Sequence, residues 1–207
     1  MITAVLEQAI RALGGTSVEW HCAPESTKQR IYFGNHASHL DFLAIWLALP
    51  APQRRTARPV AGRDYWERDA LRRYLARDVF NAILVDRHAG PSPSRPDAAR
   101  ATTEQLARAM GLTHSLIVFP EGTRSQSGTM SPFKSGLYFL SRLRPDAELI
   151  PVYLENLHRI LPRGETFPVP MLSRVVLGPA LASPSGEEKS QFLERARAAV
   201  VALGRAS

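Results

Sequence analysis

The chain has 207 residues, of which 44% are hydrophobic and 22% charged, so it is long enough for one domain with a substantial core. A formal charge of +7 and a pI near 10.2 indicate an anionic partner, but no nucleic-acid-binding module is visible, which argues against nucleic acid. The single cysteine, Cys22, excludes an intramolecular disulfide framework and fits a reducing compartment.

The first predicted element is an amphipathic helix over residues 1–14. Apolar side chains recur at helical spacing as far as Leu13, and two glycines then stop the pattern. Its apolar face either packs on the domain or lies on a membrane. The segment lacks the basic lead of a secretory signal, and the longest apolar run, residues 42–52, is too short to span a bilayer. We therefore expect the protein to lie on a membrane without crossing it.

Beyond residue 30, short strand-like runs alternate with helical patterns. The predicted strands cover residues 31–34, 58–61, 82–85, 116–119, 149–154 and 175–177. The predicted helices cover residues 40–49, 65–77, 97–110 and 133–143, with a final helix over 186–204 that a capping box from Ser185 to Glu188 opens. This alternation predicts a single α/β domain with a mostly parallel central sheet flanked by helices.

The first reactive motif is Asn35-His36-Ala37-Ser38-His39-Leu40-Asp41, directly after the predicted strand 31–34. A histidine with a carboxylate five residues on is typical of a general base and its orienting partner, because histidine titrates near operating pH. Five residues turn a helix by about 500°, which leaves the two side chains about 140° apart, so the chain must bend between them.

Two alternatives remain open for this motif. Ser38 and Asp41 have the spacing of a capping box, so Asp41 either orients His36, caps a helix, or does both. His39 is a competing base, although its place in the first helical turn favours His36. A metal site at His36, His39 and Asp41 lacks the spacing of a zinc signature, and no G-x-S-x-G elbow supports a serine hydrolase.

The second motif is Phe119-Pro120-Glu121-Gly122-Thr123-Arg124-Ser125, directly after the predicted strand 116–119. Polar groups also follow strand 82–85, at Asp86 and Arg87. If these strands and strand 31–34 are parallel, all three polar groups lie at the carboxyl edge of one sheet, where open α/β folds bind ligands. The sequence therefore predicts a single site.

Together the two motifs resemble the glycerolipid acyltransferases, the group that includes 1-acylglycerol-3-phosphate O-acyltransferase. Two weaker blocks, residues 83–87 and 149–152, follow the family's order, and the resemblance covers roughly residues 31–179. It implies one acyltransferase domain over residues 1–207, with helix 1–14, a catalytic core over 31–179 and helix 186–204.

The resemblance also implies roles for individual residues. His36 and Asp41 match the catalytic pair. The positions that match or adjoin substrate-binding positions are Arg87, Glu121, Gly122, Thr123, Arg124 and Lys134. Of these, Thr123 and Arg124 match phosphate-binding positions, Arg87 is either a second phosphate ligand or a surface arginine, and Lys134 is one of three lysines in an arginine-rich chain.

The implied reaction transfers a fatty acyl group from acyl-CoA or acyl carrier protein to a hydroxyl of a lysophospholipid, most specifically 1-acyl-sn-glycerol-3-phosphate, in phospholipid biosynthesis. We expect no metal and no cofactor beyond the acyl donor, and a cytoplasmic protein peripheral on the inner face of the cell membrane. The alternatives are another lysolipid or soluble hydroxyl acceptor, or a non-catalytic lipid-binding protein of the same fold.

A membrane contact is also suggested by residues 54–78, which hold eight arginines, four acidic residues and several aromatic side chains. Basic and aromatic residues together suit an anionic lipid interface. The alternative is a solvated face over an ordinary core stripe, and the sequence does not choose between them.

Overall fold

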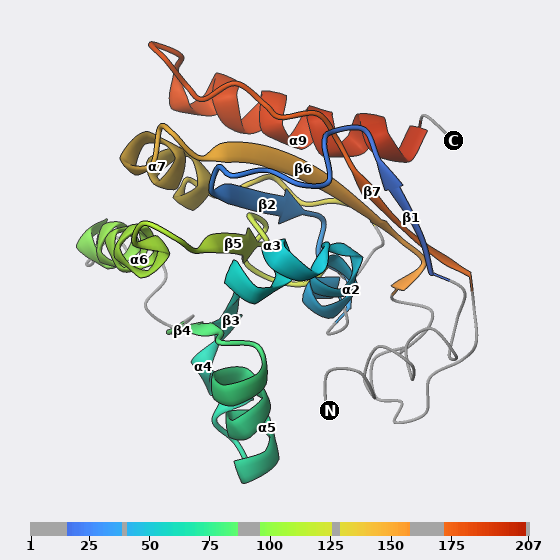
Figure 1. The fold of residues 1–207 in the computed structure, drawn as a ribbon. Coiled ribbons are helices and arrows are strands. Elements are labelled where there is room, and N and C mark those ends of the chain that lie inside the picture. The colour runs from blue at the N-terminus through green and yellow to red at the C-terminus, as the bar shows by residue number, and fades with distance from the viewer. Residues whose placement is uncertain (1–15, 39–40, 87–95, 126–128, 158–171, 206–207) are drawn as a thin grey trace.

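The fold is built on a seven-stranded sheet (Figure 1). The computed structural model describes residues 16–38, 41–86, 96–125, 129–157 and 172–205, so the predicted helix 1–14 and Arg87 lie outside the described residues. In order across the sheet, the strands are β1 (Thr16–Trp20), β7 (Ser173–Leu177), β6 (Glu148–Glu155), β2 (Arg30–Gly34), β5 (Ser115–Val118), β3 (Ala57–Gly62) and β4 (Ile83–Val85). Neighbouring strands are parallel except β6 and β7. The predicted mostly parallel sheet is thereby confirmed.

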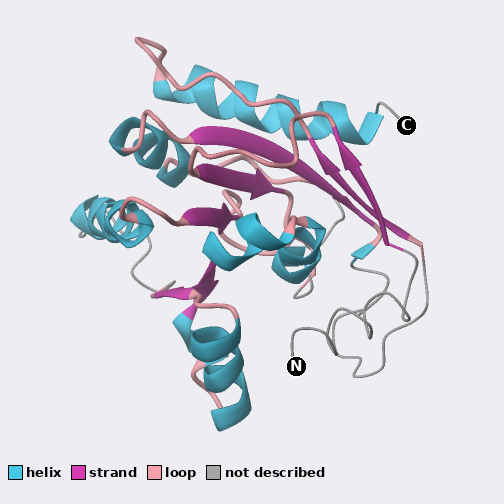
Figure 2. Cartoon of the chain, viewed as in Figure 1, coloured by secondary structure: helices cyan, strands magenta, loops and turns pink. Residues whose placement is uncertain are grey.

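Helices cover both faces of the sheet, as the cyan ribbons of Figure 2 show. The described helices are α2 (Asp41–Ala48), α3 (Ala51–Thr56), α4 (Arg63–Trp66), α5 (Ala70–Tyr74), the π-helical turn η1 (Leu75–Val79), α6 (Pro96–Met110), α7 (Gly136–Leu143) and α9 (Lys189–Arg205). One core cluster packs α2 on the face that Tyr32 occupies, and a second packs α6, α7 and α9 on the face of Ile31 and Phe33. Burial on both faces explains why β2 is apolar along its length.

Several segments differ from the predicted elements, among them helix 133–143, which begins at Gly136. The predicted helix 65–77 is divided, because the chain leaves helical geometry after Trp66 and Asp69 starts a new helix by accepting a hydrogen bond from the Arg72 N–H at 2.8 Å. Strand β1 and helix α3 have no counterpart among the predicted elements. Within the described residues, no helix is both long and apolar enough to cross a bilayer.

The final helix begins three residues later than predicted, at Lys189. The capping box from Ser185 to Glu188 is wrong, because Gly186 has a φ of +71° and the Ser185 N–H donates to the Ser183 carbonyl, so the chain turns there. The predicted apolar stripe of Phe192, Ala196, Val200 and Leu203 is confirmed and buried against the sheet.

The order of the strands creates a crevice between β2 and β5. The connection after β2 runs through α2 on one face of the sheet, whereas β5 is followed by α7 on the other face. Strands β2 and β5 are parallel neighbours, with Phe33 opposite Val118. Two parallel strands whose helices leave to opposite faces form the switch point at which α/β sheets bind ligands. Both reactive motifs begin at this crevice.

Close packing of β2 on β6 requires a glycine at the end of β2. A Cβ atom added to Gly34 would lie 2.7 Å from the Val152 carbonyl oxygen. We expect Gly34→Ala to lower the free energy of unfolding by about 1–3 kcal/mol, since the backbone of β6 has to move away. Urea denaturation measures the change.

The matched control is Gly136→Ala, where an added Cβ meets no atom within 4 Å. This substitution should leave stability unchanged or raise it by up to about 1 kcal/mol, because alanine has less freedom in the unfolded chain. Equal effects of the two substitutions would contradict the close approach at Gly34.

Candidate active site

Asn35 fixes the direction in which the chain leaves β2. Its side-chain amide donates to the Leu154 carbonyl at 2.9 Å, and its amide oxygen accepts from the Leu154 N–H at 2.8 Å. The backbone pairing of β2 with β6 ends at Gly34, and the Asn35 side chain continues it by binding the backbone of β6. As a result, the residue before His36 is anchored at the edge of the sheet.

The side chains of His36 and Asp41 meet, as the sequence predicted. His36 Nδ1 lies 2.8 Å from Asp41 Oδ2, and the side chains are 12% and 1% exposed. The same Oδ2 accepts hydrogen bonds from the Ala37 and Ser38 N–H groups at 2.7 and 2.8 Å. Asp41 therefore uses one oxygen both to cap the first turn of α2 and to orient the imidazole. The sequence left open which of these two roles Asp41 has, and in the structure it has both. With Nδ1–H donating to the carboxylate, the neutral ring keeps its lone pair on Nε2.

Phe119 holds the plane of the imidazole. The rings of Phe119 and His36 stack with centroids 4.3 Å apart and planes 16° from parallel. The stack restrains rotation of the imidazole and so fixes its orientation. Sequence reasoning missed Phe119. The available signal was its position, directly after the strand that pairs with β2.

The second motif turns sharply at the edge of the sheet. The Gly122 N–H donates to the Phe119 carbonyl at 3.0 Å, with Pro120 at the second position of the turn and Gly122 at a φ of +73°. The positive φ favours glycine, and an added Cβ would also lie 2.6 Å from the amine of Lys134, which would have to move. The Lys134 N–H in turn donates to the Pro120 carbonyl at 2.8 Å. The Lys134 side chain thus lies beside Gly122 at the turn.

Glu121 connects the two motifs. Its Oε1 accepts from the His36 N–H at 2.7 Å and its Oε2 from the Ser131 N–H at 2.8 Å, while the residue is only 2% exposed. The Ser125 N–H adds a further bond to the His36 carbonyl at 2.8 Å. This geometry differs from the expected contact of Glu121 with substrate, since both carboxylate oxygens bind the backbone. Its observed contacts are those of a positioning residue.

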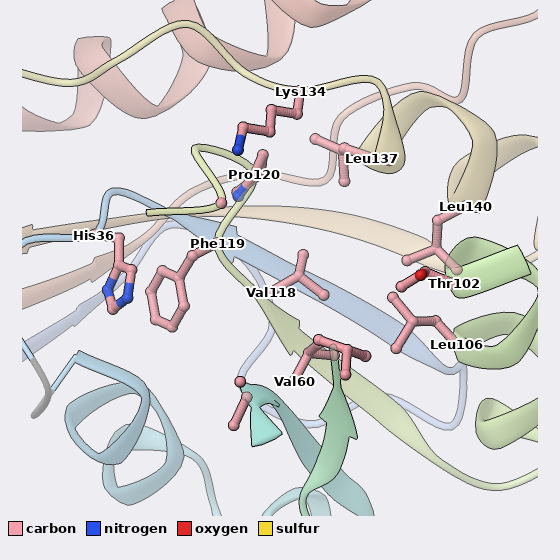
Figure 3. Close-up of a pocket in the computed structure, with 15 residues that line it drawn as sticks. His36, Val60, Thr102, Leu106, Val118, Phe119, Pro120, Lys134, Leu137 and Leu140 are labelled. Atoms are coloured by element: carbon pink, nitrogen blue, oxygen red, sulfur yellow. The ribbon is translucent and has the colours of Figure 1, made fainter. Parts of the chain in front are cut away.

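His36 forms part of the wall of two pockets. An apolar pocket of about 230 Å³ extends from His36 and Phe119 to Thr102, Leu106 and Leu140 on α6 and α7 (Figure 3). A second pocket of about 380 Å³, which is more polar than the first and is called the polar pocket below, lies on the side of β6 and α9 and is lined by residues that include Tyr153, Glu155 and Arg205. The imidazole thus stands where an apolar and a polar ligand group can meet.

The other predicted site residues differ in how close they lie to the pockets. Gly122 and Lys134 line the apolar pocket, Thr123 is exposed and Arg124 is half-buried in the same motif. Arg87 and His39 lie outside the described residues. Within the described ranges, no three histidine, cysteine or acidic side chains are grouped as metal ligands.

Comparison with known proteins identifies the family of this chain. Residues 18–155 match the protein-family model described as Acyltransferase. The chain belongs to the acyltransferase family. It is 31% identical to a 1-acyl-sn-glycerol-3-phosphate acyltransferase of Limnanthes alba over 77% of this chain and 53% of that protein. It is 30% identical to one of Haemophilus influenzae over 70% of this chain and 57% of that protein.

A solved acyltransferase structure has the same fold. The crystal structure of the 1-acyl-sn-glycerophosphate (LPA) acyltransferase PlsC from Thermotoga maritima matches with a TM-score of 0.64 and 18% identity, over 98% of this chain and 80% of that one. The chain spans about half the length of the two sequence relatives. The family and the α/β fold expected from the sequence are confirmed.

The bonds of Glu121 generate a stability prediction. We expect Glu121→Gln to lower the free energy of unfolding by about 1–3 kcal/mol, because the new amide NH₂ faces one of the two backbone N–H groups and leaves it without an acceptor. Urea denaturation measures this change.

Glu104→Gln is the matched control on the surface of α6, where Glu104 pairs with Arg100. Its effect should stay below about 0.5 kcal/mol. If Glu121→Gln proved as stable as the wild type, the carboxylate would not be the link between the motifs.

Proposed function

We propose that this chain is an O-acyltransferase that moves a fatty acyl group from acyl-CoA or acyl carrier protein to a lysophospholipid hydroxyl. The observation that carries the proposal is His36, oriented by Asp41 and Phe119 and bordering an apolar and a polar pocket. The names of its relatives favour 1-acyl-sn-glycerol-3-phosphate as the acceptor, in phospholipid biosynthesis. The protein then acts as a peripheral protein on the inner face of the cell membrane.

The reaction uses His36 first as a base and then as an acid. Nε2 takes the proton of the acceptor hydroxyl as its oxygen attacks the thioester carbonyl carbon. The tetrahedral intermediate then collapses, the C–S bond breaks, and the thiolate takes the proton from Nε2. Asp41 stabilises the imidazolium between these steps, at 2.8 Å from Nδ1. No nucleophile from the enzyme is required.

The wall of the apolar pocket supplies positive potential that stabilises the negative charge on the thioester carbonyl oxygen during attack. Gly136 opens α7 there, and the first N–H groups of a helix have no partner within it. Lys134 lies at the same wall. The Gly122 N–H, in contrast, already donates to the Phe119 carbonyl, so it is not the oxyanion donor in this arrangement.

The two substrates occupy different surroundings. The apolar pocket receives the acyl chain, because burial of methylene groups there removes apolar surface from water. Thr123, Arg124 and Arg87 bind the phosphate of the acceptor, for which guanidinium groups are suited by shape and charge. Asp41, Glu121 and Asn35 are positioning residues for the reacting imidazole.

His36→Ala should abolish transfer to lysolipids. The expected loss of rate is on the order of 10²–10⁴-fold, the range for removal of a general base. An assay with a panel of lysolipids, with acyl-CoA and acyl carrier protein as donors, measures it and identifies the acceptor.

His39→Ala is the matched control and should retain most of the activity, and chelators should have no effect. Wild-type rates in His36→Ala would remove His36 from the mechanism. Turnover that chelators abolish would indicate a metal site instead.

Filling the far end of the apolar pocket should shorten the preferred acyl chain. Leu106→Phe adds volume on α6, away from His36 (Figure 3), and we expect the ratio of long-chain to short-chain turnover to fall about tenfold. Competition between acyl donors of different length measures the ratio. Leu143→Phe, on the exposed side of α7, should leave it unchanged. An equal change in both variants would contradict the placement of the acyl chain.

A further inference from the structure

A helical arm projects from the sheet between β3 and β4 (Figure 1). We define the arm as residues 63–79, which comprise α4, α5 and η1. Its base is fixed by aromatic contacts, since the ring of Trp66 lies edge-on to Phe42 and Phe80 with centroids 5.5 and 6.2 Å apart. Ala76 is fully buried at the same base. The arm is therefore held to the domain on one side.

The other side of the arm exposes apolar side chains to solvent. Leu71 is 68% exposed and Tyr74 is 44% exposed. The two residues are three apart on α5, so they lie on the same face of the helix. A single exposed leucine is ordinary, but a leucine and a tyrosine together on a projecting helix form an apolar surface with nothing against it in the described structure.

Arginines surround this apolar pair. The arm holds five arginines and four carboxylates, and Arg72 and Arg73 stand between Leu71 and Tyr74 in the sequence. Arg72 lies over the Tyr65 ring at 4.3 Å and is held by Asp69 at 3.2 Å, and Arg77 is held by Glu67 at 3.0 Å. Arg73 is exposed and has no acidic partner within the described residues. The ion pairs orient two guanidinium groups, and the third is available for an external anion.

We propose that the arm docks on an anionic phospholipid surface. Leu71 and Tyr74 enter the interface between headgroups and acyl chains, and Arg73, with Arg72 beside it, faces the lipid phosphates. The net charge of +7 attracts the whole chain to the same surface. A lipid surface fits better than an acidic protein, because a leucine and a tyrosine with flanking arginines match the layered polarity of a bilayer interface.

The base of the arm also adjoins the candidate active site. Gly62, the last residue of β3, lines the apolar pocket, and the arm begins at the next residue. Docking through the arm keeps the candidate active site close to the membrane from which a lysolipid is drawn. This use of the contact rests on the proposed function, whereas the binding itself does not.

The test is co-sedimentation of the full chain with vesicles of phosphatidylcholine alone or with phosphatidylglycerol, in the absence of substrate. We expect binding to the anionic vesicles that weakens with salt. Leu71→Ser with Tyr74→Ser should lower the partition coefficient about tenfold, and Arg73→Gln about fivefold. The matched controls are Leu112→Ser and Arg108→Gln, which replace an exposed leucine and an exposed arginine. Arg108 lies on α6 and Leu112 directly follows it, and Figure 1 shows α6 apart from the arm.

Partition unchanged in the arm variants, or lowered equally in the controls, would overturn the proposal. The same holds if the variants lose binding to acyl carrier protein but keep binding to vesicles, which would make the arm a protein contact.

Acyl transfer to a lysolipid dispersed in detergent separates the two proposals. In detergent, the arm variants should transfer acyl groups at wild-type rates. If the wild-type protein binds vesicles through the arm but transfers no acyl group, the proposed function is refuted and the membrane contact is not.

Discussion

The site depends on one buried carboxylate. Glu121 accepts hydrogen bonds from the His36 and Ser131 N–H groups, and these residues belong to segments far apart in the sequence. Burial of an ionised group is costly unless its oxygens are paired, so the bonds and the burial require each other. Because the Ser125 N–H also binds the His36 carbonyl, the backbone of His36 is held from the second motif on both sides. The position of the imidazole is consequently set by the backbone before any substrate is present.

The sheet supplies the frame on which this carboxylate acts. Parallel pairing of β2 with β5 and β6 brings the ends of all three strands to one edge, and Asn35 binds Leu154 across that edge. The exit of α2 and α7 to opposite faces opens the crevice that the two motifs enter. The fold therefore brings together a histidine, a carboxylate and an aromatic ring that the chain order keeps apart.

Local patterns predicted six of the seven strands, the mostly parallel sheet and the meeting of His36 with Asp41, since each depends on short-range spacing or on a simple edge rule. They did not predict the contacts of Glu121, whose partners are backbone N–H groups that residue types do not reveal. The stack of Phe119 on His36 depends on strand register. Helix 65–77 was predicted as continuous because apolar spacing conceals the break that the Asp69 cap introduces. Ser185 was predicted as a cap because the capping-box pattern specifies only residues 185 and 188 and takes no account of the turn at Gly186 between them.

The place of His36 between two pockets has a consequence for how such an enzyme diversifies. Residues from β3, α6 and α7 shape the apolar side, whereas residues from β6 and α9 shape the polar side, and the imidazole is shared. A side chain that lines only one of the pockets is able to change without altering the lining of the other, so the two pockets are able to diverge separately in evolution. The reacting group itself has no such freedom, because any shift of the ring alters both walls at once.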